Sequence, residues 1–307
     1  MAPQYAKNQS EGFINAIQNV AIVGTTGQIG KLFTEHLLKS GNQTMTALTR
    51  SGSETTLPHS VNNNSPVDYN DEATLMAALK DQDFLVITLS FLAPPDTHSK
   101  LVRAAVMAAA GRYLANMKEI EELGASWIGL PPNFWYEYSL GVGPFTYGFD
   151  FPNSAVTFYD ERTMKINTTT WPQCGRALAA LVNVKRLPED ENDHLSTLAQ
   201  FCNQPVYISS FTLTQREMFD IENKLLNRTD NNWKISYQNT AERYKEGLKE
   251  LKNGDGTGFL KAMYARVFDP VSGGTFETHN AVLGLPKENL DEATLSAHSW
   301  SISQAKR

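Results

Sequence analysis

The 307-residue chain has few of the residues that mark secreted, metal-binding or hydrolytic proteins. Its two cysteines, Cys174 and Cys202, lack the spacing of paired metal ligands. We therefore predict reduced, partly buried thiols in a cytoplasmic protein, and no metal site. The six histidines are scattered, without a Ser-His-Asp or His-x-x-x-His grouping, so the sequence does not support a hydrolase or a metal enzyme.

Long apolar runs and basic clusters are also absent. No stretch approaches the length of a transmembrane helix, and the polar segment 1–15 does not resemble a signal peptide. Acidic residues outnumber Lys and Arg by 33 to 27, which gives a net charge of −6. We therefore expect an ordinary globular protein that has neither a membrane nor a nucleic acid as its partner.

Glycine is spaced regularly in the segment 19–31. An apolar run at 19–23 precedes the glycines, and from Gln28 onward apolar residues recur at helical spacing. The segment therefore reads as a strand, a glycine turn and a helix. The free amides at the start of such a helix favour a phosphate, and glycine lets the phosphate approach the backbone closely. A tight turn that binds nothing is the alternative. We predict a dinucleotide site at seven consecutive residues, Gly24, Thr25, Thr26, Gly27, Gln28, Ile29 and Gly30.

The second predicted strand, 45–49, ends at Arg50, and no acidic residue follows before Glu54. In a doubly wound fold this strand end faces the adenine ribose. An acid there binds the 2′-hydroxyl of NAD, whereas an arginine accommodates the 2′-phosphate of NADP. Arg50 therefore favours NADP (NADPH) as the cofactor, the alternative being a surface arginine that binds nothing.

Strands and helices alternate as far as residue 110. This pattern predicts an α/β fold with a Rossmann-like, doubly wound parallel sheet. The fourth strand ends at Ser90 and Phe91, at the sheet edge where ligands bind, so we add both residues to the cofactor site. After a polar loop at 54–66 we expect strands at 67–69 and 84–89, and helices at 72–80 and from Asp96 or Thr97 to Ala110.

The alternation fails at Gly111. A second helical pattern, 112–123, follows the first with no strand or turn between them. Either one long helix bends at Gly111 or two helices meet there. A further strand is expected at 125–130.

The second half of the chain is expected to be mixed. The aromatic loop 141–153 either lines a substrate pocket or covers a sheet edge. We assign 16–212 to the NADP-binding domain, with this loop contributing to the substrate side, and 213–307 to a smaller substrate-side region. Strands are expected at 206–210 and 233–237, and helices at 173–182, 214–226, 241–251 and 259–268.

Several segments together resemble one family. They are the glycine triplet, the strand end at 48–50, the helix end at 120–124 and the Asn133-Phe134 pair with the aromatic run after it. The combination is similar to the NmrA-like, isoflavone reductase-type branch of the atypical short-chain dehydrogenases. Segments 157–160, 165–171 and 173–177 resemble fungal members in particular, and the resemblance runs from about residue 19 to about residue 285.

This resemblance implies an NADPH-dependent reductase. Such a protein transfers hydride to a small, often aromatic or heterocyclic molecule, here in a fungal secondary-metabolite pathway. The family implies an NADP-binding domain with a smaller region that closes over the substrate. We place Asn133, Phe134 and Tyr147 of the aromatic loop on the substrate side.

Two departures from the family bear on activity. The family has a further strand and an active-site loop where this chain runs through residues 110–112, and that segment is missing here. Its reductases also carry a lysine early in the following helix, at the position that holds Tyr113 here. Tyr113 either donates a proton or only packs, and Lys118 is the second catalytic candidate. Two alternatives stay open: a non-catalytic NADP(H)-sensing regulator with a protein partner, and a deletion-impaired relative of the reductases.

Overall fold

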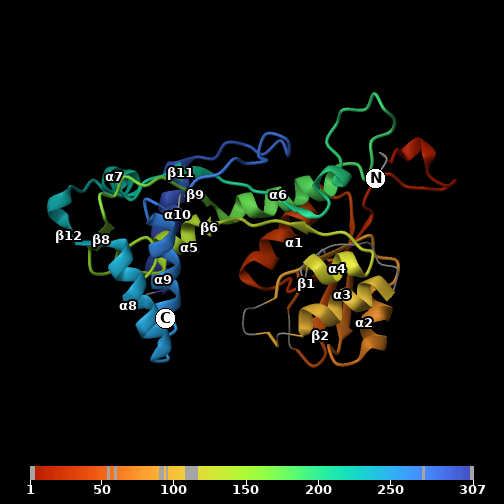
Figure 1. Cartoon of the computed structure of the whole chain (residues 1–307), viewed down its shortest axis with the longest axis horizontal. Coiled ribbons are helices and arrows are strands. Elements are labelled where there is room, and N and C mark those ends of the chain that lie inside the picture. Colours follow the sequence, from red (N-terminus) through yellow and green to blue (C-terminus); the bar gives the residue numbers. More distant parts are fainter. Residues whose placement is uncertain are drawn as a thin grey trace. The chain divides into compact units, whose positions relative to one another are not determined.

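The structure, a computed structural model, describes residues 4–53, 56–58, 61–89, 93–94, 96–107, 117–271 and 274–304 (Figure 1). Contacts divide the chain into two compact units. Each unit consists of three separate segments of the chain, and the six segments alternate between the units. Unit 1 comprises Met1–Pro131, Cys174–Val206 and His279–Leu285, and unit 2 comprises Pro132–Gln173, Tyr207–Thr278 and Pro286–Arg307.

Unit 1 contains a parallel four-stranded sheet in the order β3-β2-β1-β4. The chain moves outward from β1 to β3 and then returns to place β4 on the other side of β1. This is the doubly wound arrangement that the alternating pattern predicts, and it is confirmed. The elements are β1 Asn19–Val23, α1 Gln28–Ser40, β2 Thr44–Arg50, β3 Asn63–Val67, α2 Glu72–Leu79, β4 Phe84–Ile87 and α3 Thr97–Met107.

Both faces of this sheet are covered, which accounts for its continuous apolar strands. Ala21 and Val23 of β1 pack in a core cluster with buried residues of α2 and α3. Val20 and Ile22 point to the opposite face and are also 0% exposed. The Asp71 side chain accepts a hydrogen bond of 3.0 Å from the Ala73 amide, so α2 has the predicted N-cap.

Two predicted strands are wrong in position. β3 occupies 63–67, within the predicted polar loop and ahead of the strand expected at 67–69. It is an edge strand with mostly exposed or half-buried side chains, so it lacks an apolar pattern. The strand expected at 206–210 does not form, and β10 Gln204–Pro205 and β11 Phe211–Leu213 flank that segment.

The predicted helical joint at Gly111 and the missing family segment at 110–112 lie outside the described residues. The described helices on either side are α3 and α4 Met117–Glu122. After α4, the short strand β5 Ile128–Gly129 pairs in parallel with β10.

Helix α6, Trp171–Asn183, packs closely on α1. A methyl group on Gly175 of α6 would lie 2.3 Å from Cδ2 of His36 and 2.8 Å from the carbonyl oxygen of Leu32, both in α1. Only glycine allows this approach. The contact places α6 directly against the helix that follows the glycine loop.

Unit 2 contains two three-stranded sheets, in the orders β11-β9-β6 and β12-β8-β7, around an aromatic core. Tyr147, Phe149 and Phe151 of the aromatic loop belong to that core. The remaining elements are β6 Phe134–Trp135, α5 Tyr136–Gly141, β7 Phe149–Asp150, β8 Ala155–Tyr159, β9 Ile166–Thr169, α7 Gln215–Leu225, β12 Lys234–Gln238, α8 Thr240–Lys252, α9 Thr257–Phe268 and α10 Leu290–Gln304.

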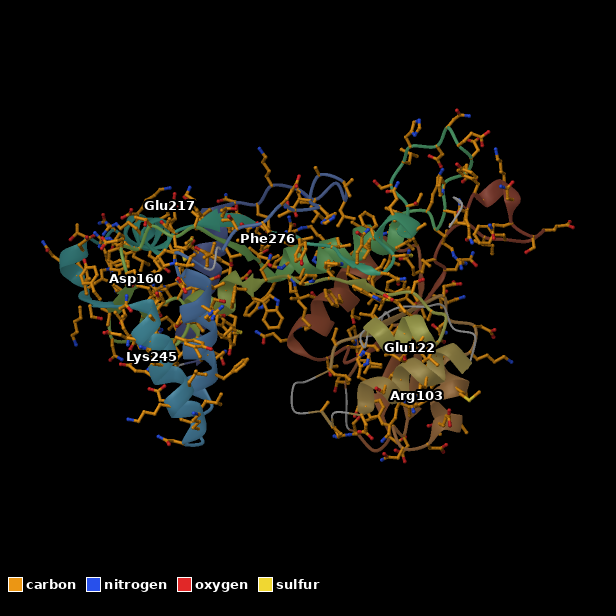
Figure 2. All side chains as sticks on the ribbon, viewed as in Figure 1. Arg103, Glu122, Asp160, Glu217, Lys245 and Phe276 are labelled. Carbon is orange, nitrogen blue, oxygen red and sulfur yellow. The ribbon has the colours of Figure 1, made fainter. Side chains whose placement is uncertain are left out.

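Helices α8 and α9 form a tight hairpin (Figure 1). A methyl group on Gly247 would lie 2.7 Å from the carbonyl oxygen of Gly258, and one on Gly258 would lie 2.4 Å from that of Gly247. Asp160, labelled in Figure 2, accepts a hydrogen bond of 3.1 Å from the Thr240 amide at the start of α8. In the described part of the chain, no helix is both long and apolar enough to cross a membrane.

Candidate functional site

The glycine loop begins at Gly24, directly after β1. Gly24 has φ of +82°, in the left-handed region, and a methyl group on it would lie 2.3 Å from the carbonyl oxygen of Thr88. The turn closes through a hydrogen bond of 2.9 Å from the Gly27 amide to the Gly24 carbonyl oxygen. Both the conformation and the space therefore require glycine at position 24.

Gly30 lets α1 sit against this loop. A methyl group on Gly30 would lie 2.0 Å from the Gly24 carbonyl oxygen and 2.8 Å from Oγ1 of Thr88. This is the close helix-to-strand packing that the glycine spacing predicts. The first turn of α1 is thereby held at the carboxyl end of β1.

The start of α1 is open to an anion. Every residue of α1 is described. Its N-cap residue is Gly27, which has no side chain to accept a hydrogen bond from the first turn. The first turn of α1 also contains no acidic residue. Thr26, Gly27 and Gln28 are exposed, whereas Thr25 and Gly30 are buried. The amides at this end and the helix dipole thus offer an uncompensated site for phosphate oxygens.

Thr88, which the sequence analysis did not place in the site, holds the loop from the neighbouring strand. Its hydroxyl donates a hydrogen bond of 2.7 Å to the Val23 carbonyl oxygen, and its amide donates to the same oxygen at 3.1 Å. These bonds tie the end of β4 to the end of β1. A threonine ending a buried apolar strand is the signal that could have revealed this role.

Arg50 ends β2, next to β1 in the same sheet. Its side chain is exposed and has no ion-pair partner among the described residues. Burial raises the pKa of Tyr69, and the positive charge of Arg50 partly opposes that rise. The guanidinium is therefore close enough to act on the Tyr69 hydroxyl. A hydrogen bond of 2.9 Å from the Ser51 amide to the Val67 carbonyl oxygen fixes the backbone after it. A cation at this strand end suits a phosphate.

Several predicted residues cannot be placed beside this loop. Ser90, Phe91 and Tyr113 lie outside the described residues. Lys118 lies in α4, and only its backbone is described. The glycine loop and Arg50 are thus the predicted cofactor residues that the structure brings to the carboxyl edge of one sheet.

Asn133 of the predicted substrate side lies in unit 2. It has φ of +57°, which is uncommon for a residue with a side chain. Its Nδ2 donates a hydrogen bond of 2.6 Å to the carbonyl oxygen of Ile208. The bond holds the backbone turn that leads into β6.

Phe134 and Tyr147 share partners in unit 2. The Tyr147 hydroxyl donates to Oγ1 of Thr168 at 2.9 Å, and Thr168 Oγ1 donates to the Phe134 carbonyl oxygen at 2.8 Å. The ring of Tyr264 lies 4.5 Å from that of Phe134 and 5.6 Å from that of Tyr147. Tyr147 is 0% exposed, and this burial raises its pKa, so its hydroxyl stays a neutral structural donor. Phe134 is half-buried and remains the more accessible of the two.

These features define the class of unit 1. It is a Rossmann-like nucleotide-binding unit, with a parallel sheet, a glycine turn and an uncapped helix at the strand ends. The described residues hold no group of three His, Cys, Asp or Glu side chains arranged as metal ligands.

Comparisons with known proteins agree with that class. Residues 24–120 match a family described as NAD(P)H-binding. The oxidoreductase aprR of Aspergillus flavus is 24% identical, over 90% of this chain and 97% of the relative. A solved isoflavone reductase has a TM-score of 0.66 at 16% identity, covering 91% of this chain and 99% of that chain. The NADPH-dependent quinone oxidoreductase QOR2 of Escherichia coli, solved with NADPH, has a TM-score of 0.62 at 18% identity, covering 90% and 98%.

Residues 24–120 are therefore similar to the NAD(P)H-binding family, and the chain is similar in fold to isoflavone reductase. The fold is that of isoflavone reductase, an α/β fold with a parallel Rossmann-like sheet and a smaller region.

Proposed function

We propose that this protein uses NADPH to reduce a small aromatic or heterocyclic metabolite. The observation that carries the proposal is the glycine loop, where Gly24 and Gly30 leave no room for a side chain and the start of α1 is uncapped. Such a cradle fits a pyrophosphate, which needs backbone amides at close range. The proposed cofactor residues are Gly24–Gly30 and Arg50, together with Ser90 and Phe91.

The residues of this chain have distinct tasks in the proposal. The amides of Gln28, Ile29 and Gly30 bind the pyrophosphate, and Arg50 binds the 2′-phosphate of the adenine ribose. When bound, NADPH supplies the hydride, which reduces an electrophilic carbon of the substrate while a proton completes the reduction. Asn133 and Phe134, and less directly the buried Tyr147, shape the substrate side. We assign that role to unit 2, and nucleotide binding to unit 1.

The proton donor is proposed to be Tyr113 or Lys118. Tyr113 stands where reductases of the family carry a lysine. This difference also favours a second function, a regulator that binds NADP(H) without turnover and acts on a protein partner. The aprR and QOR2 relatives favour the reductase, because both are oxidoreductases by name. We further propose a cytoplasmic role in fungal secondary metabolism.

Thermal unfolding with nucleotides tests the binding step. Saturating NADPH should raise the melting temperature, because a ligand that binds only the folded state stabilises it, and NADH should raise it less. The absorbance of NADPH then shows whether the protein oxidises it in the presence of aromatic carbonyl compounds. Oxidation indicates a reductase, and binding without oxidation indicates a sensor. Loss of turnover in Tyr113→Phe or Lys118→Ala, with nucleotide stabilisation intact, identifies the proton donor. A melting temperature unmoved by either nucleotide overturns both functions.

A further inference from the structure

Strand β12 is an edge strand of unit 2 and pairs with β8 alone (Figure 1). At its start, the Lys234 amide donates a hydrogen bond of 2.8 Å to the Ser154 carbonyl oxygen, just before β8. At its end, the Gln238 carbonyl oxygen accepts one of 3.1 Å from the Asp160 amide, just after β8. Backbone groups alternate in direction along a strand, so Lys234, Ser236 and Gln238 are the residues that bond to β8.

The backbone groups of Ile235 and Tyr237 therefore point away from β8. No described residue forms a hydrogen bond with either amide or with either carbonyl oxygen of these two residues. The Tyr237 side chain is 63% exposed, and the side chains of Lys234 and Ser236 on the other face are exposed as well. Such a row of unpaired groups is a template for a further strand.

The other edge strands of the described sheets are short or blocked. β3 has the same length of five residues, but it contains Pro66, which has no amide hydrogen to donate. The remaining edge strands have four residues or fewer. Strand β12 is thus the long edge without a proline in the described part of the chain.

We propose that β12 pairs antiparallel with β12 of a second copy of this chain, around a two-fold axis at Ser236. Ile235 then lies opposite Tyr237 of the second copy, and each such pair exchanges two hydrogen bonds. The four bonds use every outward amide and carbonyl group of both copies. The pairing does not involve the nucleotide, so it stands or falls separately from the proposed function.

The side chains on the core face suit this register. Ile235 is half-buried and packs on the aromatic core of unit 2. The Tyr237 ring lies 5.9 Å from that of Phe158, and its hydroxyl accepts a hydrogen bond of 3.0 Å from Nη1 of Arg162. Its exposed side would be covered by Ile235 of the second copy, and aromatic rings and β-branched side chains form favourable cross-strand pairs.

The charges at the two ends of β12 are complementary as well. Lys234 has no ion-pair partner among the described residues, and the register places it opposite Gln238 of the second copy. Nε2 of Gln238 donates a hydrogen bond of 2.7 Å to Oε2 of Glu246, whose side chain is 53% exposed and whose ion pair with Lys261 is long, at 3.8 Å. Arg243 also contacts Gln238 but is 3% exposed. Each Lys234 therefore meets the Glu246 carboxylate of the other copy.

Sedimentation velocity of the full chain, from about 1 to about 200 μM, tests the pairing, since so small an interface gives a weak dimer. Tyr237→Pro removes the outward amide hydrogen and leaves the bonds to β8 in place, because alternate residues make them. Lys234→Glu and Glu246→Lys each place like charges at both ends of the paired strands. Lys287→Glu, a charge reversal at an exposed position outside β12 and α8, is the control.

The wild-type chain and the control should show the same concentration-dependent dimer, and Tyr237→Pro should show none. Each charge variant alone should raise the Kd of the dimer about tenfold, because two surface ion pairs become two repulsive contacts. An equal mixture of Lys234→Glu and Glu246→Lys should recover the wild-type Kd, because the mixed pair has opposite charges at both ends. Misfolding cannot produce such a recovery.

A wild-type chain that stays monomeric over the whole range overturns the pairing and leaves the edge for a strand of another protein. A dimer that persists in Tyr237→Pro and in both charge variants also overturns it, because the copies then meet elsewhere. So does a mixture that fails to recover the dimer. Melting temperatures check that each variant folds, and if Tyr237→Pro does not, the exposed charge variants and their mixture decide.

Discussion

Oε2 of Glu222 lies 3.6 Å from Nδ1 of His298, where α7 meets α10 inside unit 2. Glu222 is 1% exposed, and its other carboxyl oxygen has no hydrogen-bond partner among the described residues. Burial raises the pKa of Glu222 to about 8, although the charge of Arg228 opposes the shift. Burial also lowers the pKa of His298, so both side chains are neutral near pH 7. The pair is a neutral contact in an aromatic core, and it makes stability depend on pH.

Glu222→Gln should remove much of that dependence. The folded chain keeps the Glu222 proton to about pH 8, whereas the unfolded chain releases it near 4.5. This contribution to stability is therefore complete below pH 4.5 and disappears as the pH rises to 8, at up to about 1.4 kcal/mol per pH unit. Urea unfolding of both proteins from about pH 5 to about pH 9 measures the difference. Glu242→Gln, at an exposed position on α8, is the control. Parallel curves for the wild type and Glu222→Gln would contradict the assignment.

Gly30→Ala should disrupt the glycine loop. The added methyl group would lie 2.0 Å from a backbone oxygen that cannot move without displacing β1. We expect a loss of about 3 kcal/mol in the free energy of unfolding and no stabilisation by NADPH. Denaturant unfolding with and without the nucleotide measures both effects. Gly256→Ala, where nothing lies within 4 Å, should leave both unchanged. If NADPH still stabilised the Gly30→Ala variant fully, the loop would not be the nucleotide site.

Arg50→Ala should change the preference between the two nucleotides. Removing the guanidinium eliminates a charge-assisted contact to the 2′-phosphate, which NADH does not have. We expect the Kd of NADPH to rise about tenfold, with that of NADH unchanged. Fluorescence titration of each nucleotide measures the two constants. Lys249→Ala, an exposed change on α8, should alter neither. An equal rise in the Kd of both nucleotides would mean that Arg50 does not bind the 2′-phosphate.

Gly175→Ala should separate α6 from α1. The new methyl group would lie 2.3 Å from the His36 ring and 2.8 Å from the Leu32 carbonyl oxygen. We expect a loss of about 2 kcal/mol of stability. The double change Gly175→Ala with His36→Ala should recover part of it, because the ring clash is relieved and the backbone clash remains. A double-mutant cycle from urea unfolding gives the coupling. Strictly additive losses would show that the helices do not touch at this point.

The sequence predicts the nucleotide-binding half of the molecule well because its signals are local. The glycines at 24, 27 and 30 lie between a strand and a helix that are both confirmed, and Asp71 caps α2 as expected. Edge strand β3 was not predicted because Asn63 and Asn64 are polar and its pairing with β2 comes from the backbone.

The ring contacts that join Trp135, Tyr138, Trp300 and Trp171 in unit 2 illustrate the other limit of prediction from one sequence. Trp135 and Trp171 are 36 positions apart in sequence, and Trp300 is more distant still. Only the pairing of β6 with β9 and the contact of α5 with α10 bring these rings together. The spacing of residues along the chain does not show which distant rings contact each other. It also does not show that Tyr147 is buried in the core.

The alternation of six segments between the two units has a consequence for synthesis on the ribosome. Unit 1 receives its last segment, His279–Leu285, when more than nine-tenths of the chain has been made. The parallel sheet can form early, since β1 to β4 lie within the first 87 residues. The segments that complete the unit arrive only after most of unit 2 has emerged. Neither unit can therefore mature as an independent domain during translation, and a chain that stops early would expose the unfinished surfaces of both to chaperones and proteases.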